Sequence, residues 1–302
     1  MTSQQVDLTP SGTGPVDWLE RLRRYALLVR LNRPIGILLL MWPTLWALWI
    51  GGEGTPAWHI VLVFVTGVAL MRSAGCAIND YADRDFDAHV ARTQGRPIAT
   101  GLVTPGEALG VFVALSLTAA SLLFFLNWPT RFMSLVALLL TVIYPFMKRY
   151  THLPQVVLGA AFGWAIPMAF MALNESVPLV AWLLFSTALI WALIYDTQYA
   201  MVDREDDIKI GVKSSAILFG KHDKLIIGLL QVVMILLLLV IGILVERGVA
   251  YYLGLTLGIG LFVYQQWLIR AREPKACFDA FLNNNQFGMV IFIALVIDYL
   301  VH

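Results

Sequence analysis

Long apolar stretches separated by polar connectors occupy the chain from about residue 34 to its C-terminus. A helix needs about 20 mostly apolar residues to cross a bilayer. The fold class that this pattern predicts is an all-α polytopic membrane protein with about nine transmembrane helices. The predicted spans are residues 34–52, 57–78, 105–126, 131–147, 153–173, 178–198, 224–245, 249–269 and 286–301, of which the fourth and ninth are short.

Composition favours a membrane protein over a soluble one. Of the 302 residues, 59% are hydrophobic and 14% are charged, whereas soluble domains carry about 25% charged residues. The net charge of +1 offers no basic face, so we expect no nucleic-acid partner. Cys76 and Cys277 form no metal-binding or disulfide pattern. Nothing in the sequence indicates an obligate protein partner.

The N-terminal region divides into two parts. Residues 1–16 are polar and small, which is typical of a disordered tail, and they contain no cleavable signal. From residue 17 to 33, Trp18, Leu22 and Tyr25 recur at helical spacing with arginines between them. This pattern predicts a basic amphipathic helix on the membrane surface. Residues 17–302 are therefore expected to form a single transmembrane domain.

The distribution of basic residues orients the predicted spans. Of the 21 Lys and Arg residues, all but Arg131 and Arg247 fall on one side when the nine spans are counted through. Basic connectors stay on the cytoplasmic side of a membrane. The N-terminus and the long charged loops are therefore expected in the cytoplasm, with His302 on the other side.

Two acidic clusters, residues 79–87 and 203–207, each follow an apolar span. Carboxylates are costly beside hydrocarbon, so such clusters indicate a function. If both spans continue as helices, Asn79, Asp80, Asp83 and Asp87 share an arc of about 100° and Asp85 turns away. On the same assumption Asp196, Asp203 and Asp207 share an arc of about 40°. An oxygen-only ligand set favours Mg²⁺ or Ca²⁺. The expected metal ligands are Asn79, Asp83, Asp87, Asp203 and Asp207.

Cations accompany both clusters, and together they suit a diphosphate, whose negative charge needs metal and cations at once. The alternative is a set of solvated loop charges that pair with one another, which describes Asp85, Glu205 and Asp206 better. The expected diphosphate-binding residues are Arg92, Arg96, Lys148, Lys209 and Lys213.

Three arginines at the predicted cytoplasmic ends of spans can bind the carboxylate of a small anionic acceptor, or extend to the surface for structural reasons alone. Aromatic side chains nearby can stabilise a carbocation. The expected acceptor-binding residues are Arg33, Arg72, Arg149, Tyr144 and Tyr195.

The motifs Asn79-Asp80-x-x-Asp83-x-x-x-Asp87 and Asp203-x-x-x-Asp207-x-x-x-Gly211-x-x-Ser214 resemble the paired aspartate motifs of the UbiA superfamily of intramembrane prenyltransferases. The resemblance covers the chain from about residue 20. It includes Asn32-Arg33-Pro34, Arg92-Thr93, Arg96-Pro97 and Lys148-Arg149. Residues 148–155 and 195–203 are most similar to the bacterial branch that prenylates 4-hydroxybenzoate for ubiquinone synthesis. Many relatives in the superfamily carry Tyr at Asp196 and Lys at Ala200.

The resemblance implies helices ringed around a central cavity, with Mg²⁺ and diphosphate at a cytoplasmic mouth and a tunnel open to membrane lipid. It also implies transfer of a polyprenyl group from polyprenyl diphosphate to the carbon ortho to the hydroxyl of 4-hydroxybenzoate, in the bacterial inner membrane. Asp83 and Asp203 would be catalytic through Mg²⁺, and Asp196 would contact the phenol and accept its proton.

Two other functions fit parts of the sequence. The same chemistry on homogentisate, a naphthoate, haem or a glycerol phosphate would use similar carboxylates. A cation-coupled transporter is disfavoured, because transporters place charges near the bilayer midplane on broken helices, and here the centres of the spans carry no charge.

Overall fold

The computed structural model describes residues 17–88 and 93–302, and in this part of the chain the regular elements are all helices. The tail predicted for residues 1–16 lies outside the described residues. In chain order the helices are α1 (Trp18–Leu28), α2 (Ile35–Gly51), α3 (Trp58–Asp87), α4 (Pro105–Leu122), η1 (Leu123–Phe125), α5 (Trp128–Ile143), η2 (Tyr144–Arg149), α6 (Pro154–Gly163), α7 (Ala165–Asn174), α8 (Leu179–Ile210), α9 (Ser215–Phe219), η3 (Gly220–His222), α10 (Asp223–Leu244), α11 (Val249–Leu268), η4 (Ile269–Ala271) and α12 (Pro274–Val301).

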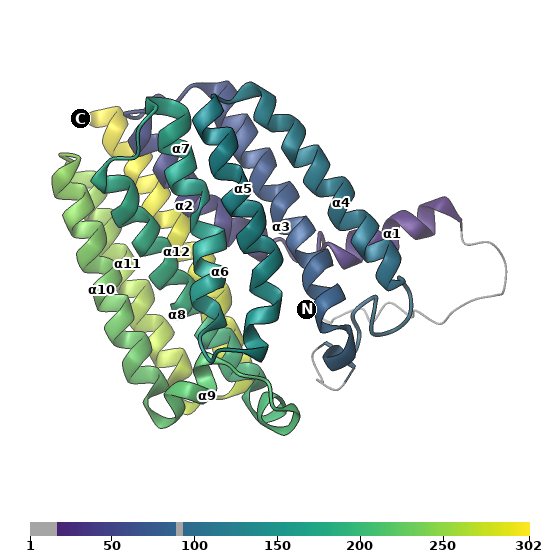
Figure 1. Ribbon diagram of the computed structural model, residues 1–302. Helices are drawn as coiled ribbons and strands as arrows, with labels where there is room; N and C mark the ends of the chain where they lie inside the picture. The colour runs from purple at the N-terminus through teal and green to yellow at the C-terminus, as the bar shows by residue number, and fades with distance from the viewer. Residues whose placement is uncertain (1–16, 89–92) are drawn as a thin grey trace.

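The predicted spans correspond to one helical bundle (Figure 1). Eight segments of the described chain are long and apolar enough to cross a membrane, which makes this a multi-pass membrane protein. The first predicted span is α2, whose 17 residues are at the lower limit of about 17 for a spanning helix. The number of crossings and the cytoplasmic position of the N-terminus stay predictions.

Two predicted spans were wrong at their boundaries. The fourth is not short, since helix runs from Trp128 through Arg149. The ninth begins at Pro274 rather than residue 286, because the polar run Asn283–Gln286 interrupts the apolar pattern without ending the helix. In the structure Asn283 and Asn284 are buried within the bundle, and Asn284 Nδ2 donates to Gln198 Oε1 at 2.8 Å.

Helices α3 and α8 extend beyond their apolar parts and carry both acidic clusters on regular helix, as predicted. Helix α8 ends at Gly211, whose φ of +71° is easily adopted by glycine. Between α6 and α7 the axis is interrupted near Trp164, three residues before Pro167, which lacks an N–H to donate into the preceding turn. These features fix where the site residues lie along each helix.

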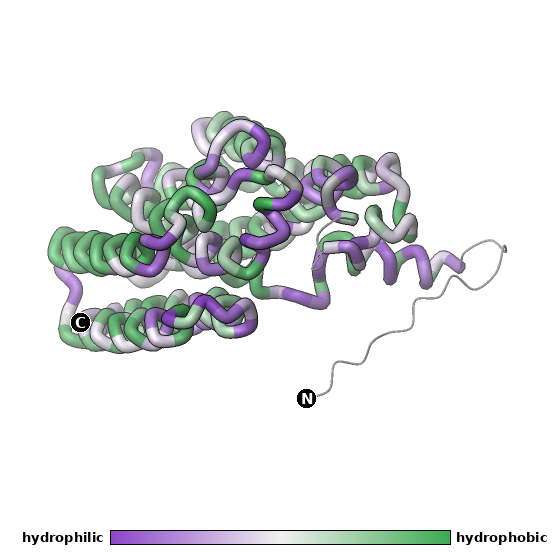
Figure 2. The backbone as a smooth tube through the Cα atoms, turned by 90° about the horizontal axis from the view of Figure 1, so that it is seen from below, coloured by the Kyte–Doolittle hydropathy of each residue, from purple (hydrophilic) through white to green (hydrophobic). Residues whose placement is uncertain are grey.

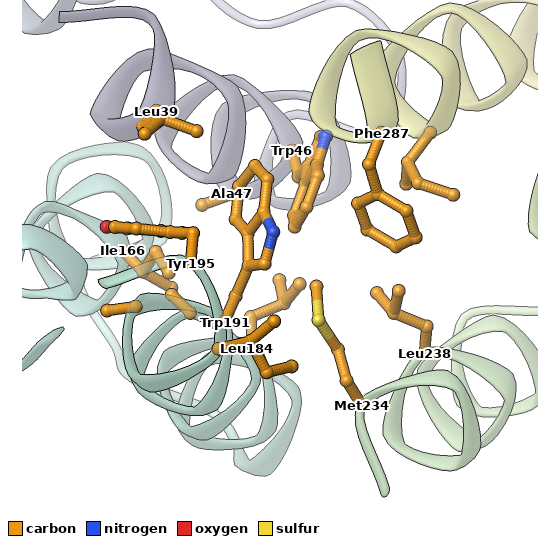
Figure 3. Close-up of a cluster of buried hydrophobic side chains, with 14 of the residues drawn as sticks. Leu39, Trp46, Ala47, Ile166, Leu184, Trp191, Tyr195, Met234, Leu238 and Phe287 are labelled. Carbon is orange, nitrogen blue, oxygen red and sulfur yellow. The ribbon is translucent and has the colours of Figure 1, made fainter. Parts of the chain in front are cut away.

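A cluster of buried hydrophobic side chains joins α2, α8, α10 and α12 (Figure 3). Trp46 stacks on Trp191 with ring centroids 5.4 Å apart, and Phe287 and Met234 complete this buried contact. Helices α3 and α4 pack along each other at the opposite side of the bundle. The core therefore occupies one side and leaves the other side for a cavity.

Helix α1 projects from the bundle, crosswise to its helices (Figure 1). Polar contacts join it to the bundle: Tyr25 Oη donates to Glu107 Oε1 at 3.0 Å, and Arg24 Nη1 donates to the carbonyl of Leu102 at 3.4 Å. Leu28 adds an apolar contact, because it is buried in a cluster with residues of α3 and α4. Figure 2 shows the contrast in hydropathy between this hydrophilic helix and the apolar helices of the bundle. The arrangement suits the interfacial helix predicted for residues 17–33.

Candidate active site

A cavity of about 700 Å³ opens among α2, α3, α4, α5, α6, α8 and the first turns of α12. One end is lined by the acidic clusters of α3 and α8, and the remainder is largely apolar, with Val68, Leu126 and Leu138 among its walls. No described residue of α10 or α11 lines it. The cavity therefore borders the aromatic core, and Tyr195 belongs to both.

Three carboxylates of the first acidic cluster, Asp80, Asp83 and Asp87, are buried around Arg96. Asp83 is 4% and Asp87 5% exposed. Arg96 Nη1 lies 2.8 Å from Asp87 Oδ2, 3.3 Å from Asp80 Oδ1 and 3.8 Å from Asp83 Oδ2. Burial raises the pKa of Asp87, and the charge of Arg96 acts against that shift. Arg96 thus neutralises charge where an anionic ligand would otherwise be repelled.

A second arginine, which sequence reasoning missed, reaches the same cluster. Arg30 Nη2 lies 2.7 Å from Asp80 Oδ1, which is 1% exposed. Arg30 has a left-handed backbone, with φ of +58°, in the turn that ends α1. The sequence places Arg30 only on a basic amphipathic helix, so no local signal separates it from its neighbours.

The lysines predicted for the diphosphate differ in position. Lys148 Nζ lies 2.5 Å from Asp83 Oδ1, so the structure brings it to the cluster. Lys213 lines the cavity, and its Nζ donates to the carbonyl of Tyr150 at 3.3 Å. Lys209 is exposed, pairs with Asp206 at 3.2 Å and is not among the described lining residues. Arg92 lies outside the described residues.

The second acidic helix contributes the facing wall. Asp196, Asp203 and Asp207 of α8 all line the cavity, as the arc of about 40° predicts. Asn79 lines it from α3, and its Nδ2 donates to Asp83 Oδ2 at 3.1 Å. Asp85 and Glu205 are exposed, in agreement with their predicted role as solvated charges. Both clusters therefore face one space.

The oxygen donors suit Mg²⁺ that a ligand helps to coordinate. Among the described residues, no group of three or more His, Cys, Asp and Glu side chains is placed to hold a metal ion by itself. Mg²⁺ commonly takes only one or two carboxylates and fills its shell with phosphate oxygens and water. The described lining of the cavity supplies carboxylates and contains no His or Cys, which matches that preference.

Of the three arginines predicted to bind the acceptor, two are among the described residues that line the cavity and one is not. Arg33 and Arg72 line the cavity, whereas Arg149 is not among the described lining residues and donates from Nη2 to the carbonyl of Ala82 at 2.6 Å. Arg72 packs over Phe162 at 5.7 Å, and its buried Nε has no hydrogen-bond partner within the described chain. Arg72 therefore presents a donor suited to an anionic group.

Two tyrosines predicted near the acceptor, Tyr144 and Tyr195, line the cavity. Tyr195 is 3% exposed and packs edge-on to Trp191 at 5.7 Å. Sequence reasoning missed Gln155, which lines the cavity at 3% exposure. A single glutamine in an apolar span gives no signal of its own.

Comparisons with known proteins agree on one family. The profile described as the UbiA prenyltransferase family matches residues 40–295. A 4-hydroxybenzoate octaprenyltransferase from Alkalilimnicola ehrlichii is 59% identical over 279 residues, covering 92% of this chain and 95% of the relative. One of the same name from Aeromonas salmonicida is 58% identical over 281 residues, covering 93% and 97%.

Solved structures share the fold. The apo structure of a UbiA homolog from Aeropyrum pernix K1 superposes with a TM-score of 0.76 at 21% identity, over 86% of this chain and 97% of that one. The structure of a UbiA homolog from Archaeoglobus fulgidus bound to GPP and Mg²⁺ gives 0.70 at 18% identity, over 90% and 99%. At such identities the likeness establishes the arrangement of helices.

Proposed function

The chain belongs to the UbiA prenyltransferase family, and on that premise we propose that it prenylates 4-hydroxybenzoate. The reaction transfers a polyprenyl group from polyprenyl diphosphate to the ring carbon ortho to the hydroxyl and releases diphosphate. The observation that carries the proposal is a single cavity that joins buried, cation-paired carboxylates to an apolar compartment. Relatives 59% and 58% identical bear the name of this activity.

The charged end of the cavity receives the diphosphate. Asn79, Asp83 and Asp203, with Asp87 and Asp207, are the residues that hold Mg²⁺, which when bound neutralises the leaving diphosphate. Arg96 and Lys148 already lie against these carboxylates and donate charge-assisted hydrogen bonds to phosphate oxygens. Lys213 belongs to the same lining, and we keep Arg92 and Lys209 as further proposed contacts of the diphosphate.

The apolar walls protect the reactive centre. Loss of diphosphate leaves an allylic cation, which water would trap, and Val68, Leu126 and Leu138 line a region that excludes water. Faces of Tyr144 and Tyr195 at the cavity wall stabilise the cation, by up to about 2 kcal/mol each when desolvated. The polyprenyl chain occupies the apolar region and extends into lipid.

The acceptor lies between the cation and the arginines. Arg72, with its unpartnered Nε, binds the carboxylate, and Arg33 contributes positive charge at the mouth. Asp196 accepts the proton that the aromatic acceptor loses as the new carbon–carbon bond forms. Arg149 acts indirectly, through the carbonyl of Ala82 on α3.

We place this chemistry at the cytoplasmic face of the bacterial inner membrane, in one transmembrane domain spanning residues 17–302. The orientation rests on the basic residues that accompany both acidic clusters, since positive loops stay on the cytoplasmic side. The interfacial helix α1 lies against that face.

The test is an assay of membranes that contain the protein, supplied with a long polyprenyl diphosphate, Mg²⁺ and one acceptor at a time. We expect prenylated 4-hydroxybenzoate, identified by mass, and little product from homogentisate or a dihydroxynaphthoate. Preferential prenylation of another acceptor would keep the family chemistry and replace the acceptor. Absence of Mg²⁺-dependent prenyl transfer to every acceptor would contradict the proposal.

A further inference from the structure

Gln155 is a polar side chain of the cavity that has no role in the chemistry described above. Gln155 lies in the first turn of α6 and is 3% exposed, and its Oε1 has no hydrogen-bond partner within the described chain. A buried hydrogen-bond acceptor that is left unsatisfied is destabilising, because it has lost its bonds to water. Because Gln155 also lines the cavity, a ligand there can supply the missing donor.

The packing of α6 against α8 shows how deep Gln155 lies. A methyl group on Gly163 would come within 3.1 Å of Phe185 and 3.4 Å of Ala188, and one on Gly159 within 3.0 Å of Leu189 and Ala192. The two helices therefore run antiparallel, and a step of four residues towards the start of α6 matches a step of four residues towards the end of α8.

The same register continued by one turn brings Gln155 level with residues 193–196 of α8, the turn that contains Asp196. Asp203 lies seven residues further along α8, which is about 10 Å along the helix axis. Gln155 is therefore too deep to serve the metal-binding end of the cavity and sits at the level of the acceptor instead.

Arg72 lies where the carboxylate end of a bound 4-hydroxybenzoate would be. Its guanidinium packs over Phe162, which lies on α6 two turns beyond Gln155, about 10 Å along the axis. Arg72 and Gln155 thus line the same cavity at different depths. Within the described chain, the hydrogen-bond donor Arg72 Nε and the hydrogen-bond acceptor Gln155 Oε1 both lack a partner. A para-hydroxybenzoate has the complementary groups at opposite ends of a rigid ring: a carboxylate that accepts and a hydroxyl that donates.

We infer that Gln155 Oε1 accepts a hydrogen bond from the phenolic hydroxyl of 4-hydroxybenzoate. This bond selects for a substrate whose hydroxyl lies opposite its carboxylate. The inference rests on the proposed function. It also assigns the proton: the product keeps its hydroxyl, so the proton lost is the one on the ortho ring carbon. As that carbon bonds to the prenyl carbon and the prenyl carbon–oxygen bond breaks, the ring proton passes to the carboxylate of Asp196, which lies at the same depth.

The test compares Gln155→Met, which keeps the size of the side chain and removes the acceptor, with Leu158→Met. Leu158 lines the same cavity three residues along α6, so its variant controls for altered packing. For Gln155→Met we expect the KM for 4-hydroxybenzoate to rise about tenfold or more. The KM for polyprenyl diphosphate and the inhibition constant of benzoate, which has no hydroxyl, should stay as in the parent. Leu158→Met should change none of the three selectively.

Equal weakening of benzoate and 4-hydroxybenzoate, or a rise confined to polyprenyl diphosphate, would overturn the inference. If Gln155→Met does not fold, the unaltered protein still decides, because 4-fluorobenzoate and benzoate should both bind about tenfold more weakly than 4-hydroxybenzoate. Equal binding of all three would contradict a bond to the hydroxyl. If the unaltered protein makes no prenylated 4-hydroxybenzoate, the proposed function fails first and this inference with it.

Discussion

One nitrogen of Arg96, Nη1, pairs with both carboxylate oxygens of Asp87, at 2.9 Å from Oδ1 and 2.8 Å from Oδ2. The pair joins the loop that follows the first acidic cluster to the end of α3. The same nitrogen lies within 3.3 Å of Asp80. One guanidinium therefore both holds the loop in place and offsets the repulsion among buried carboxylates.

We predict that Arg96→Ala lowers stability by about 3 kcal/mol, because removing one partner leaves buried charges uncompensated. It should also raise the KM for polyprenyl diphosphate at least tenfold. Thermal denaturation in detergent and steady-state kinetics measure the two effects. Arg84→Ala is the matched control, since Arg84 is more exposed and lies 3.8 Å from the exposed Asp85. An Arg96→Ala protein as stable as this control would contradict the role assigned to the ion pair.

Gly36→Ala is predicted to impair acceptor binding selectively. A methyl group at Gly36 would lie 2.6 Å from Arg72 Nε and 2.6 Å from Arg72 Nη2, so the guanidinium has to move. We expect the KM for 4-hydroxybenzoate to rise about tenfold while the KM for polyprenyl diphosphate stays unchanged.

Gly110→Ala serves as its control, because a methyl group at Gly110 of α4 meets no atom within 4 Å in the described chain. This variant should be as active as the parent, and slightly more stable, since alanine restricts the unfolded chain. Unchanged acceptor kinetics in Gly36→Ala would show that Arg72 does not bind the acceptor in the arrangement described.

Gln265→Leu is predicted to destabilise the bundle by about 3 kcal/mol, because several buried amides lose their partners together. Gln265 Oε1 accepts from Gln198 and Gln231, at 3.1 Å each, and its Nε2 donates to Asn283 at 3.0 Å. Four helices, α8, α10, α11 and α12, meet in this network. The melting temperature in detergent measures the loss.

Gln286→Leu tests whether the loss is specific to the buried network, since Gln286 is exposed and lies at its edge, where it accepts a hydrogen bond from Asn283 Nδ2 at 2.6 Å. Its melting temperature should change far less. Equal effects of the two substitutions would indicate that the network contributes little to stability.

The acidic stripes could be predicted from the sequence because helical periodicity continues past the apolar residues of α3 and α8. Spacing alone then places Asp83 and Asp87, or Asp203 and Asp207, on one face. The structure confirms both helices and brings both stripes to one cavity. Family membership was likewise predictable, since the motifs that carry it are short and local.

The residues that the sequence missed act through tertiary packing. Arg30 reaches Asp80 only because α1 ends in a left-handed turn. Gln155 becomes distinctive only when α6 is in register with α8. The start of α12 was missed because Asn283 and Asn284 look like the end of a span, and only their partners on α8 and α11 explain why a spanning helix can contain them.

Joint use of the two acidic helix ends on one diphosphate is measured most directly by the Mg²⁺ dependence of prenyl transfer. The parent is compared with Asp83→Asn, Asp203→Asn and the exposed control Asp85→Asn. We predict that chelation of Mg²⁺ abolishes the prenylated product. Asp83→Asn and Asp203→Asn should each lower the rate at least about hundredfold, as expected when electrostatic stabilisation of a leaving group is removed. Asp85→Asn should match the parent. Full activity in either Asp83→Asn or Asp203→Asn, with the same Mg²⁺ requirement, would contradict the account.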